Sequence, residues 1–486
     1  MHVISDSTGI PSMGHGHIVG QIADSQFFGN GYSTPETRWI FSDLRRLQRW
    51  LDVEVALAQT QSEIGMIPEE VGDILASTAR IERLDLDAIG DDIASSGHSL
   101  VPLLRAWQKT LPPTAAQYVH FGATTQDIQD TAQSLEIAES LDLIERDLLA
   151  VVVELARLAE ENRDTVTIGR SHGQHALPTT MGLKFAIWLD ETLRNLERLR
   201  VCRRTVCVAQ LFGGVGTMAA FGRFGVDLLE RFAGRLGLRA PDVAWHTARD
   251  RVAEFLSTLA LVSGGLANIG NEIVQLAKTD VGELAEPFEL GNIGSSTMPH
   301  KRNPELSERV VVLARLVKQT ASLGFEALCN EHERDYRAVR LEWVAIADAV
   351  LHTAAALELM KKILSGLVVN YERIAANVEE AAQNICSEAL MFQLGSRLGK
   401  SAAYQVVYDA VFLGREANGS LVDRLLEDMR VAGHFDRDAL IDTVTPANHL
   451  GSAGRLIEGV VKRARDVLTS ASSVGADTLD AARAKA

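Results

Sequence analysis

Proline placement constrains this chain more than any other feature of its sequence. Only 12 of the 486 residues are proline, and none lies between Pro113 and Pro178 or between Pro304 and Pro446. Because proline breaks helix interiors, long stretches without it leave room for very long helices. Both intervals are therefore candidates for helices much longer than those of an average globular protein.

Apolar side chains recur at helical spacing in and around these intervals. They repeat at steps of three and four residues in four stripes, at 44–58, 141–155, 252–273 and 310–320. Segments that alternate polar and apolar residues between Asn-Gly or Asp-Gly turns are nearly absent. This pattern predicts an all-α protein whose helices pack as a bundle, with faces broad enough to bury against other subunits.

Composition narrows the possible function classes. Hydrophobic residues make up 46% and charged residues 23%, which is typical of a globular protein. The net charge of -16 argues against a nucleic-acid partner, because phosphate binding needs a basic face. We find no apolar run of the ~18 residues that a membrane span needs, no leader and no CxxC spacing. We therefore expect a cytoplasmic protein with no membrane contact and no metal site.

A loop rich in glycine and proline at residues 291–304, GNIGSSTMPHKRNP, is the first segment suited to chemistry. Its two glycines, two serines and two prolines cannot continue a helix. Backbone N–H groups in such a loop can hold an oxyanion or activate a serine hydroxyl, with Lys301 and Asn303 close by. Composition alone equally allows an ordinary solvated loop.

Two further interruptions of the helical pattern carry polar side chains. Residues 120–127, HFGATTQD, precede a long predicted helix. Thr124 and Thr125 are good N-cap residues there, and their hydroxyls could instead bind a substrate carboxylate at the helix N-terminus. Residues 169–180, GRSHGQHALPTT, place two histidines beside an arginine. Histidine is the side chain best suited to move protons near neutral pH.

Together these segments resemble the shared regions of the fumarase/aspartase superfamily. Residues 294–304, GSSTMPHKRNP, are similar to the signature of its adenylosuccinate lyase branch. Residues 120–131 and 170–182 resemble the other two shared regions, in the expected order. The similarity continues through YSTPE at 32–36, QLFGGVGT at 210–217 and EHERD at 331–335, and covers the chain from about residue 30 to residue 470.

The resemblance implies a three-domain, mostly helical subunit that assembles as a homotetramer around a long central bundle. A flexible N-terminal arm would comprise residues 1–30 and an N-terminal helical domain residues 31–116. The central bundle would span 117–368, with the signature loop at 291–304, and a C-terminal helical domain would span 369–486. Each active site would collect segments from three subunits, and the family implies no metal or organic cofactor.

The resemblance also implies an anti β-elimination that releases fumarate from a substituted succinate, a small dicarboxylate. Removing a proton next to a carboxylate needs a strong base and stabilisation of the doubly charged intermediate. Ser295 matches the family's base, Lys301 a catalytic cation that holds the substrate carboxylate, and His172 the group that protonates the leaving group. The other residues expected to bind substrate are His98, Ser99, Thr124, Thr125, Gln126, Arg170, Arg204, Gln210, Ser296, Met298, Asn303 and Arg334.

Departures from the family pattern bear on the substrate. Adenylosuccinate lyase binds its nucleotide phosphate with a serine and an arginine, five and nine positions after the arginine of its His-Glu-Arg-Asp motif. Counting from Arg334, these positions hold Val339 and Trp343, and Gly31 stands where that enzyme has another arginine. A phosphate dianion buried against these side chains would lack its hydrogen-bond partners. We therefore expect a substrate without a phosphate.

Nitrosuccinate lyase, or a related carbon–nitrogen lyase of specialised metabolism, fits this expectation best. The alternative is 3-carboxy-cis,cis-muconate cycloisomerase, which is similar at Glu342-Trp343 but generally lacks the histidine that matches His172. Adenylosuccinate lyase is less favoured because of the missing phosphate ligands. An inactive, structural member of the fold is also less favoured, because the expected catalytic residues are all present.

Overall fold

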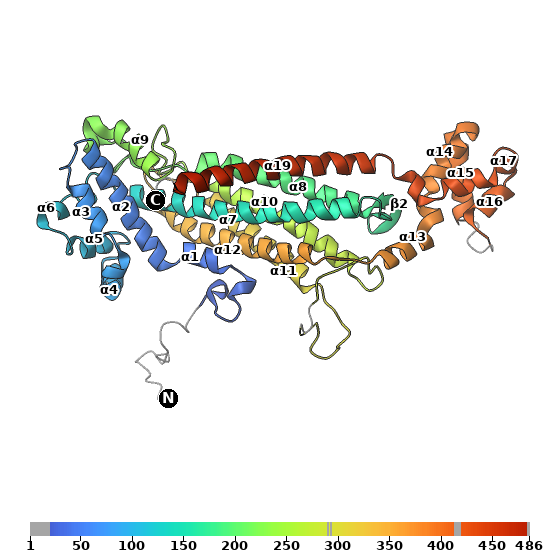
Figure 1. Ribbon diagram of the computed structural model, residues 1–486, viewed down its shortest axis with the longest axis horizontal. Helices are drawn as coiled ribbons and strands as arrows, with labels where there is room; N and C mark the ends of the chain where they lie inside the picture. Colours follow the sequence, from blue (N-terminus) through green and yellow to red (C-terminus); the bar gives the residue numbers. More distant parts are fainter. Residues whose placement is uncertain (1–19, 289–290, 292–293, 413–418, 484–486) are drawn as a thin grey trace. The chain divides into compact units, whose positions relative to one another are not determined.

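The computed structural model describes residues 20–288, 291, 294–412 and 419–483, with helix side chains described as far as residue 471. The described chain is mostly α-helical, which confirms the all-α prediction (Figure 1). Contacts divide the chain into two units, each made of three segments. The first comprises Met1–Leu148, Asn195–Ala267 and Arg309–Leu359, and the second comprises Leu149–Arg194, Asn268–Glu308 and Met360–Ala486. The three contiguous domains expected from the sequence stay a prediction.

The first unit contains short N-terminal helices and the larger part of several long helices. The helices that lie entirely in this unit are α1 (Pro35–Ile40), α2 (Asp43–Glu63), α3 (Val71–Thr78), α4 (Leu86–Ser96), α5 (Val101–Gln108), α6 (Pro113–Ala116) and, later in the chain, α9 (Gly225–Arg235). The helices that contribute residues to both units are α7 (Thr125–Glu161), α8 (Met181–Val206), α10 (Asp250–Leu276), α11 (Glu305–Glu326) and α12 (Tyr336–Ser365).

The longest helices lie where proline is absent. Helix α7, with 37 residues, occupies most of the interval between Pro113 and Pro178. The interval between Pro304 and Pro446 begins with α11, with 22 residues, which is followed by α12, with 30 residues. The predicted stripe at 141–155 is buried, as Leu141, Ile144 and Leu148 are each at most 1% exposed, whereas the stripe at 44–58 begins with Leu44, which is 43% exposed. The apolar periodicity therefore marks the faces that these helices bury.

Helices α10 and α12 are long and apolar enough to cross a membrane by length and composition. Their most apolar 18-residue windows have mean hydropathies of 1.5 and 1.4, and 67% and 61% of these windows are buried inside the chain. The sequence analysis expected no apolar run of this length, and by length and composition these two helices contradict that expectation. Packing within the fold accounts for the apolar character of both helices.

The second unit contains the strands and the C-terminal helices. Strands β1 (Val166–Ser171) and β2 (Gln174–Thr180) form one antiparallel pair, and β3 (Leu284–Ala285) and β4 (Val368–Val369) form another. The helices are α13 (Tyr371–Ile385), α14 (Ser387–Leu398), α15 (Lys400–Phe412), α16 (Leu421–Glu427), α17 (Met429–Ala432), α18 (Arg437–Thr443) and α19 (Ala453–Arg483).

The segment at 169–180, expected to interrupt a helix, is part of the β1–β2 hairpin. His172 and Gly173 form its two-residue turn, with φ values of 52° and 75°. Positive φ at both turn residues suits the right-handed twist of the flanking strands, and glycine adopts it without strain. The buried side chain of Ile168 on β1 belongs to a small core with Ile385 of α13. The hairpin is therefore anchored at one end, while its turn is exposed.

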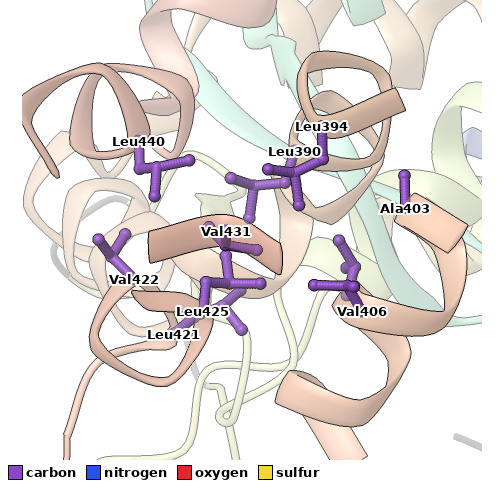
Figure 2. Packing of buried hydrophobic residues seen from close by; sticks show 10 residues of the cluster. Leu390, Leu394, Ala403, Val406, Leu421, Val422, Leu425, Val431 and Leu440 are labelled. Atoms are coloured by element: carbon purple, nitrogen blue, oxygen red, sulfur yellow. The ribbon is translucent and has the colours of Figure 1, made fainter. Parts of the chain in front are cut away.

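The C-terminal helices enclose a core of their own. Leu390 and Leu394 of α14 face Leu421 and Leu425 of α16 within a cluster that also includes Val431 of α17 (Figure 2). Each of these five side chains is fully buried. Burying a leucine contributes roughly 1.5–3 kcal/mol, so this cluster is a main source of stabilisation for the packing of these short helices.

The predicted N-terminal arm, residues 1–30, contains turns in its described part. Residues 1–19 lie outside the described part of the chain. Residues 22–24 and 29–31 form two 3₁₀ turns. The Ser33 hydroxyl donates to the Ala23 carbonyl at 2.6 Å, which ties the first turn to the segment before α1. The described part of the arm is therefore held by local hydrogen bonds.

Candidate active site

Arg334 brings two of the predicted substrate-binding residues together in the first unit. It lies just before α12, and its Nη1 atom donates to Thr124 Oγ1 at 2.8 Å. Its Nε atom donates to Gln126 Oε1 at 3.3 Å, and Nη1 also lies 3.5 Å from the Gly214 carbonyl oxygen. The guanidinium is therefore held against the N-terminus of α7, which begins at Thr125.

A buried carboxylate fixes the loop before α7. Both oxygens of Asp127, which is 0% exposed, accept hydrogen bonds. Oδ2 accepts from the backbone N–H groups of Thr124 at 3.0 Å and Gly213 at 2.9 Å. Oδ1 accepts from the Phe212 N–H at 3.0 Å and lies 3.1 Å from His246 Nε2. Asp127 thus holds Thr124 in the N-cap position and leaves the Thr124 hydroxyl to accept from Arg334.

The surroundings of Arg334 favour an anion. Within the residues that the structure describes, no carboxylate oxygen lies within 4.0 Å of its guanidinium, and its three acceptors are neutral oxygens. The N-terminus of α7 adds the partial positive charge of a helix dipole. The half-buried guanidinium therefore carries a charge that no carboxylate in the described part of the chain neutralises at short range.

Gln126 and Gln210, both expected to bind substrate, are fully buried and point at one carboxylate. The Nε2 atom of each donates to Asp130 Oδ2 at 3.1 Å. The Gln210 Oε1 atom accepts from the Trp245 backbone N–H at 3.1 Å. Both side chains are therefore enclosed by the protein in the single chain.

Asp130 belongs to a fully buried ionic network that the sequence analysis did not identify. Arg249 donates to both Asp130 oxygens, at 2.8 and 3.0 Å, and through Nε to Glu342 Oε1 at 2.7 Å. Gln133 donates to Glu342 at 2.8 Å. Burial alone would lower the pKa of the Arg249 guanidinium, but Asp130 and Glu342 outweigh that effect and raise it. Arg249 is thus a permanent cation in the core.

His120, in the same loop, pairs with a buried carboxylate of α2. Its Nδ1 atom lies 2.6 Å from Glu54 Oε1, and its backbone N–H donates to Glu54 Oε2 at 3.1 Å. Burial would lower the pKa of His120, but the Glu54 hydrogen bond and charge outweigh it, so the pKa is raised. The sequence analysis left both residues out of the candidate site. The sequence signal that could have found them is Glu54 itself, because a carboxylate among the apolar residues of the stripe at 44–58 indicates a buried charge that needs a partner.

Ser99 also lies in the first unit, in a small hydrogen-bond cycle. Its Oγ atom accepts from Gln129 Nε2 at 2.8 Å and lies 3.2 Å from the Tyr336 hydroxyl. The Tyr336 hydroxyl donates to Gln129 Oε1 at 2.5 Å. The neighbouring His98 uses Nδ1 to accept from the Val101 backbone N–H at 3.1 Å, and so begins α5. The predicted pair is therefore positioned by α5, α7 and α12.

The signature loop presents Ser295 to backbone donors. The Ser295 Oγ atom accepts from the N–H groups of Met298 at 3.1 Å and Thr297 at 3.4 Å. The Asn303 side chain donates to the Gly294 carbonyl at 3.1 Å, which closes the loop. A Cβ on Gly294 would lie 2.3 Å from the Lys301 carbonyl oxygen, so only glycine fits there. Two N–H donors aimed at one hydroxyl oxygen stabilise negative charge on it.

The remaining predicted residues fall into distinct surroundings. Arg170 is bidentate with the buried Glu283, at 3.0 and 2.5 Å, so its donors are used within the second unit rather than presented to a substrate. Arg204 lines a cavity of about 290 Å³ with Arg239, Arg251 and three acidic side chains, and none of the other predicted residues lines it. The half-buried or exposed side chains are Thr125, His172, Ser296, Met298 and Lys301.

Comparisons with known proteins identify the family. A family model described as lyase matches residues 31–318, and one described as adenylosuccinate lyase C-terminus matches residues 384–460. The N-acetyl-S-(2-succino)cysteine lyase of Dickeya dadantii is 39% identical, over 91% of this chain and 97% of that protein. The adenylosuccinate lyase of Methanothermobacter thermautotrophicus is 38% identical, over 89% and 97%.

A solved structure agrees with these sequence relatives. The 3-carboxy-cis,cis-muconate lactonizing enzyme from Pseudomonas putida superimposes with a TM-score of 0.84 at 34% identity, over 92% of this chain and 100% of that one. The resemblance inferred from the signature segments is thereby confirmed. The chain belongs to the lyase family of the fumarase/aspartase superfamily.

Proposed function

We propose that this lyase releases fumarate from a succinate that carries a small, phosphate-free substituent at C2, with nitrosuccinate as the first candidate. The base removes a proton from C3, the bond from C2 to the substituent breaks, and a double bond forms between C2 and C3. The substituent leaves with the bonding electron pair, as nitrite in the case of nitrosuccinate. Carbon–nitrogen cleavage of this kind needs no oxidant or reductant.

The main observation behind the proposal is that the Arg334 guanidinium has only neutral hydrogen-bond acceptors among the described residues. Its partners, Thr124, Gln126 and Gly214, are neutral, so an anionic substrate gains the full interaction with its charge. The cation and the N-terminus of α7 suit one carboxylate. The positions five and nine residues later supply no further ligand for a phosphate, because Val339 is fully buried and Trp343 packs against other aromatic rings.

The signature loop suits the chemical step. Deprotonating a carbon acid next to a carboxylate requires a base stronger than an ordinary serine hydroxyl. The two N–H groups that donate to Ser295 Oγ favour its alkoxide form. We assign Lys301 to the developing negative charge on the carboxylate and His172 to the leaving group. Nitrite is a weakly basic leaving group, so it needs little protonation by His172 as it departs.

A second candidate substrate is N-acetyl-S-(2-succino)cysteine. Two relatives, from Dickeya dadantii and Enterococcus italicus, are named as lyases of this compound and are 39% and 36% identical to the chain. The compound is also a C2-substituted succinate without phosphate, and its elimination would release fumarate with a thiol. It differs from nitrosuccinate in the size of the leaving group and in the bond that breaks.

Fumarate formation from a panel of substrates tests the proposal. The panel consists of nitrosuccinate, N-acetyl-S-(2-succino)cysteine, adenylosuccinate and 3-carboxy-cis,cis-muconate, each followed by product absorbance and chromatography. We expect the highest kcat/KM on nitrosuccinate. A higher value on the thioether would make the second candidate the substrate, while lactone formation from the muconate would make the chain a cycloisomerase. No activity on any of them would contradict the proposal.

We also propose that the catalytic segments act together in a homotetramer, with each site drawing on more than one subunit. Long helices leave large apolar side chains exposed in the single chain, among them Ile187, Leu261, Val312 and Val344, each at least 45% exposed. Covering such side chains favours association. Light scattering at micromolar concentration should give about four times 52.8 kDa. A mass near that of one subunit would contradict the shared site.

A further inference from the structure

The orientation of the Gln126 side chain is dictated by its neighbours. Its Nε2 atom lies 3.1 Å from Asp130 Oδ2 and 3.1 Å from the His246 carbonyl oxygen, and both atoms only accept hydrogen bonds. Its Oε1 atom lies 3.3 Å from Arg334 Nε, which only donates. Turning the amide over would oppose donor to donor and acceptor to acceptor. One orientation is therefore much more stable than the other.

The anchor of this arrangement is itself rigid. Asp130, Arg249 and Glu342 are buried to within 1% of full burial, and Arg249 is bidentate with Asp130. Breaking such a buried ion pair would leave an unpaired charge in the core, which costs several kcal/mol. Asp130 therefore stays in place, and the Gln126 amide with it.

We propose, on the basis of the function proposed above, that Gln126 is a positioning residue: it holds Arg334 for the substrate carboxylate and does not itself bind the substrate. Three observations support this role. Gln126 is 0% exposed, its amide hydrogen bonds are used within the protein, and its oxygen is directed at the guanidinium. This role replaces the direct substrate contact expected from the sequence.

The chain offers a matched control. Gln133 lies on the same helix seven residues later, is 3% exposed, and donates Nε2 to Glu342, the other carboxylate of Arg249. It has no contact with Arg334 among the described residues. Gln133→Met removes one buried hydrogen bond from this network, whereas Gln126→Met removes two and also an acceptor of Arg334.

The experiment compares these two variants by KM, by kcat and by the shift in Tm that fumarate produces. Gln126→Met should raise KM and the Kd of fumarate roughly tenfold, the size expected for the loss of one hydrogen bond to a charged group, with a smaller change in kcat. Gln133→Met should change Tm by less, because it removes fewer hydrogen bonds, and should leave KM and the fumarate Kd within about twofold of the wild type. Equal increases in both variants would overturn the proposal.

A double-mutant cycle separates positioning from direct contact. Gln126→Met introduced into an Arg334→Gln background should raise the fumarate Kd no further, because the residue acts through the lost guanidinium. Independent, additive effects would show that Gln126 contacts the ligand and would also overturn the proposal. Fumarate binding needs no turnover. The positioning role of Gln126 can therefore be wrong while the substrate assignment is right. Equally, the substrate assignment can be wrong while the positioning role is right.

Discussion

Ser295→Ala should lower kcat by at least ~10³-fold while it leaves fumarate binding within about threefold of the wild type. Removing the hydroxyl removes the proposed base together with the two hydrogen bonds that its Oγ atom accepts from the Thr297 and Met298 N–H groups, which lie in an exposed loop where water can replace the acceptor. The alkoxide is used in the transition state and not in the bound ground state. The loss should therefore appear in kcat and not in KM.

Thr297→Ala is the control for this variant. It alters an exposed side chain in the same loop and keeps the backbone N–H that donates to Ser295. Turnover should stay within a few-fold of the wild type, and circular dichroism and light scattering should match for all three proteins. A Ser295→Ala enzyme that retained a tenth of wild-type turnover would show that another group removes the proton.

The helical architecture could be predicted from the sequence because helices depend on local patterns, namely the positions of proline and the spacing of apolar residues. The proline-free intervals indicated α7 and α12, and the stripe at 141–155 marked a buried face of α7. The β1–β2 hairpin was missed because its strands are short and a bulge at Gly169 breaks their alternation. A Cβ on Gly169 would lie 2.8 Å from the Leu177 carbonyl oxygen, a close approach that only the folded hairpin reveals.

The candidate site was predictable where a motif is contiguous and not where partners are distant in sequence. Thr124 and Arg334 were both identified from motifs, but their contact joins residues 210 positions apart. Arg249 and Glu342, 93 positions apart, carry no local pattern that indicates a buried pair. Arg170 was expected to bind substrate because a cation beside two histidines suggests it. Its partner Glu283 lies 113 positions away and could not be foreseen.

Adenylosuccinate should be a poor substrate, with kcat/KM about 10³-fold or more below that of the best small succinate. One bidentate arginine–phosphate contact contributes roughly 1.5–3 kcal/mol, and two arginine positions and a serine are missing. Gly31 and Trp343 stand at the two arginine positions, and Val339 stands at the serine position. The measurement is a parallel determination of kcat/KM on both substrates. Efficient turnover of adenylosuccinate would contradict the absence of a phosphate site.

The structure predicts that exchanging the two α12 residues will not restore that site. Val339 is fully buried, so the hydroxyl of a Val339→Ser variant would face the core instead of a ligand. The Trp343 ring lies 6.1 Å from Trp50 and 6.4 Å from Tyr336, with the Arg46 guanidinium 5.6 Å from its centroid. A Trp343→Arg variant would lose these contacts and place a second cation beside Arg46. The double variant should therefore have a lower Tm and gain less than tenfold in kcat/KM on adenylosuccinate, and a larger gain would place the phosphate on this face of α12.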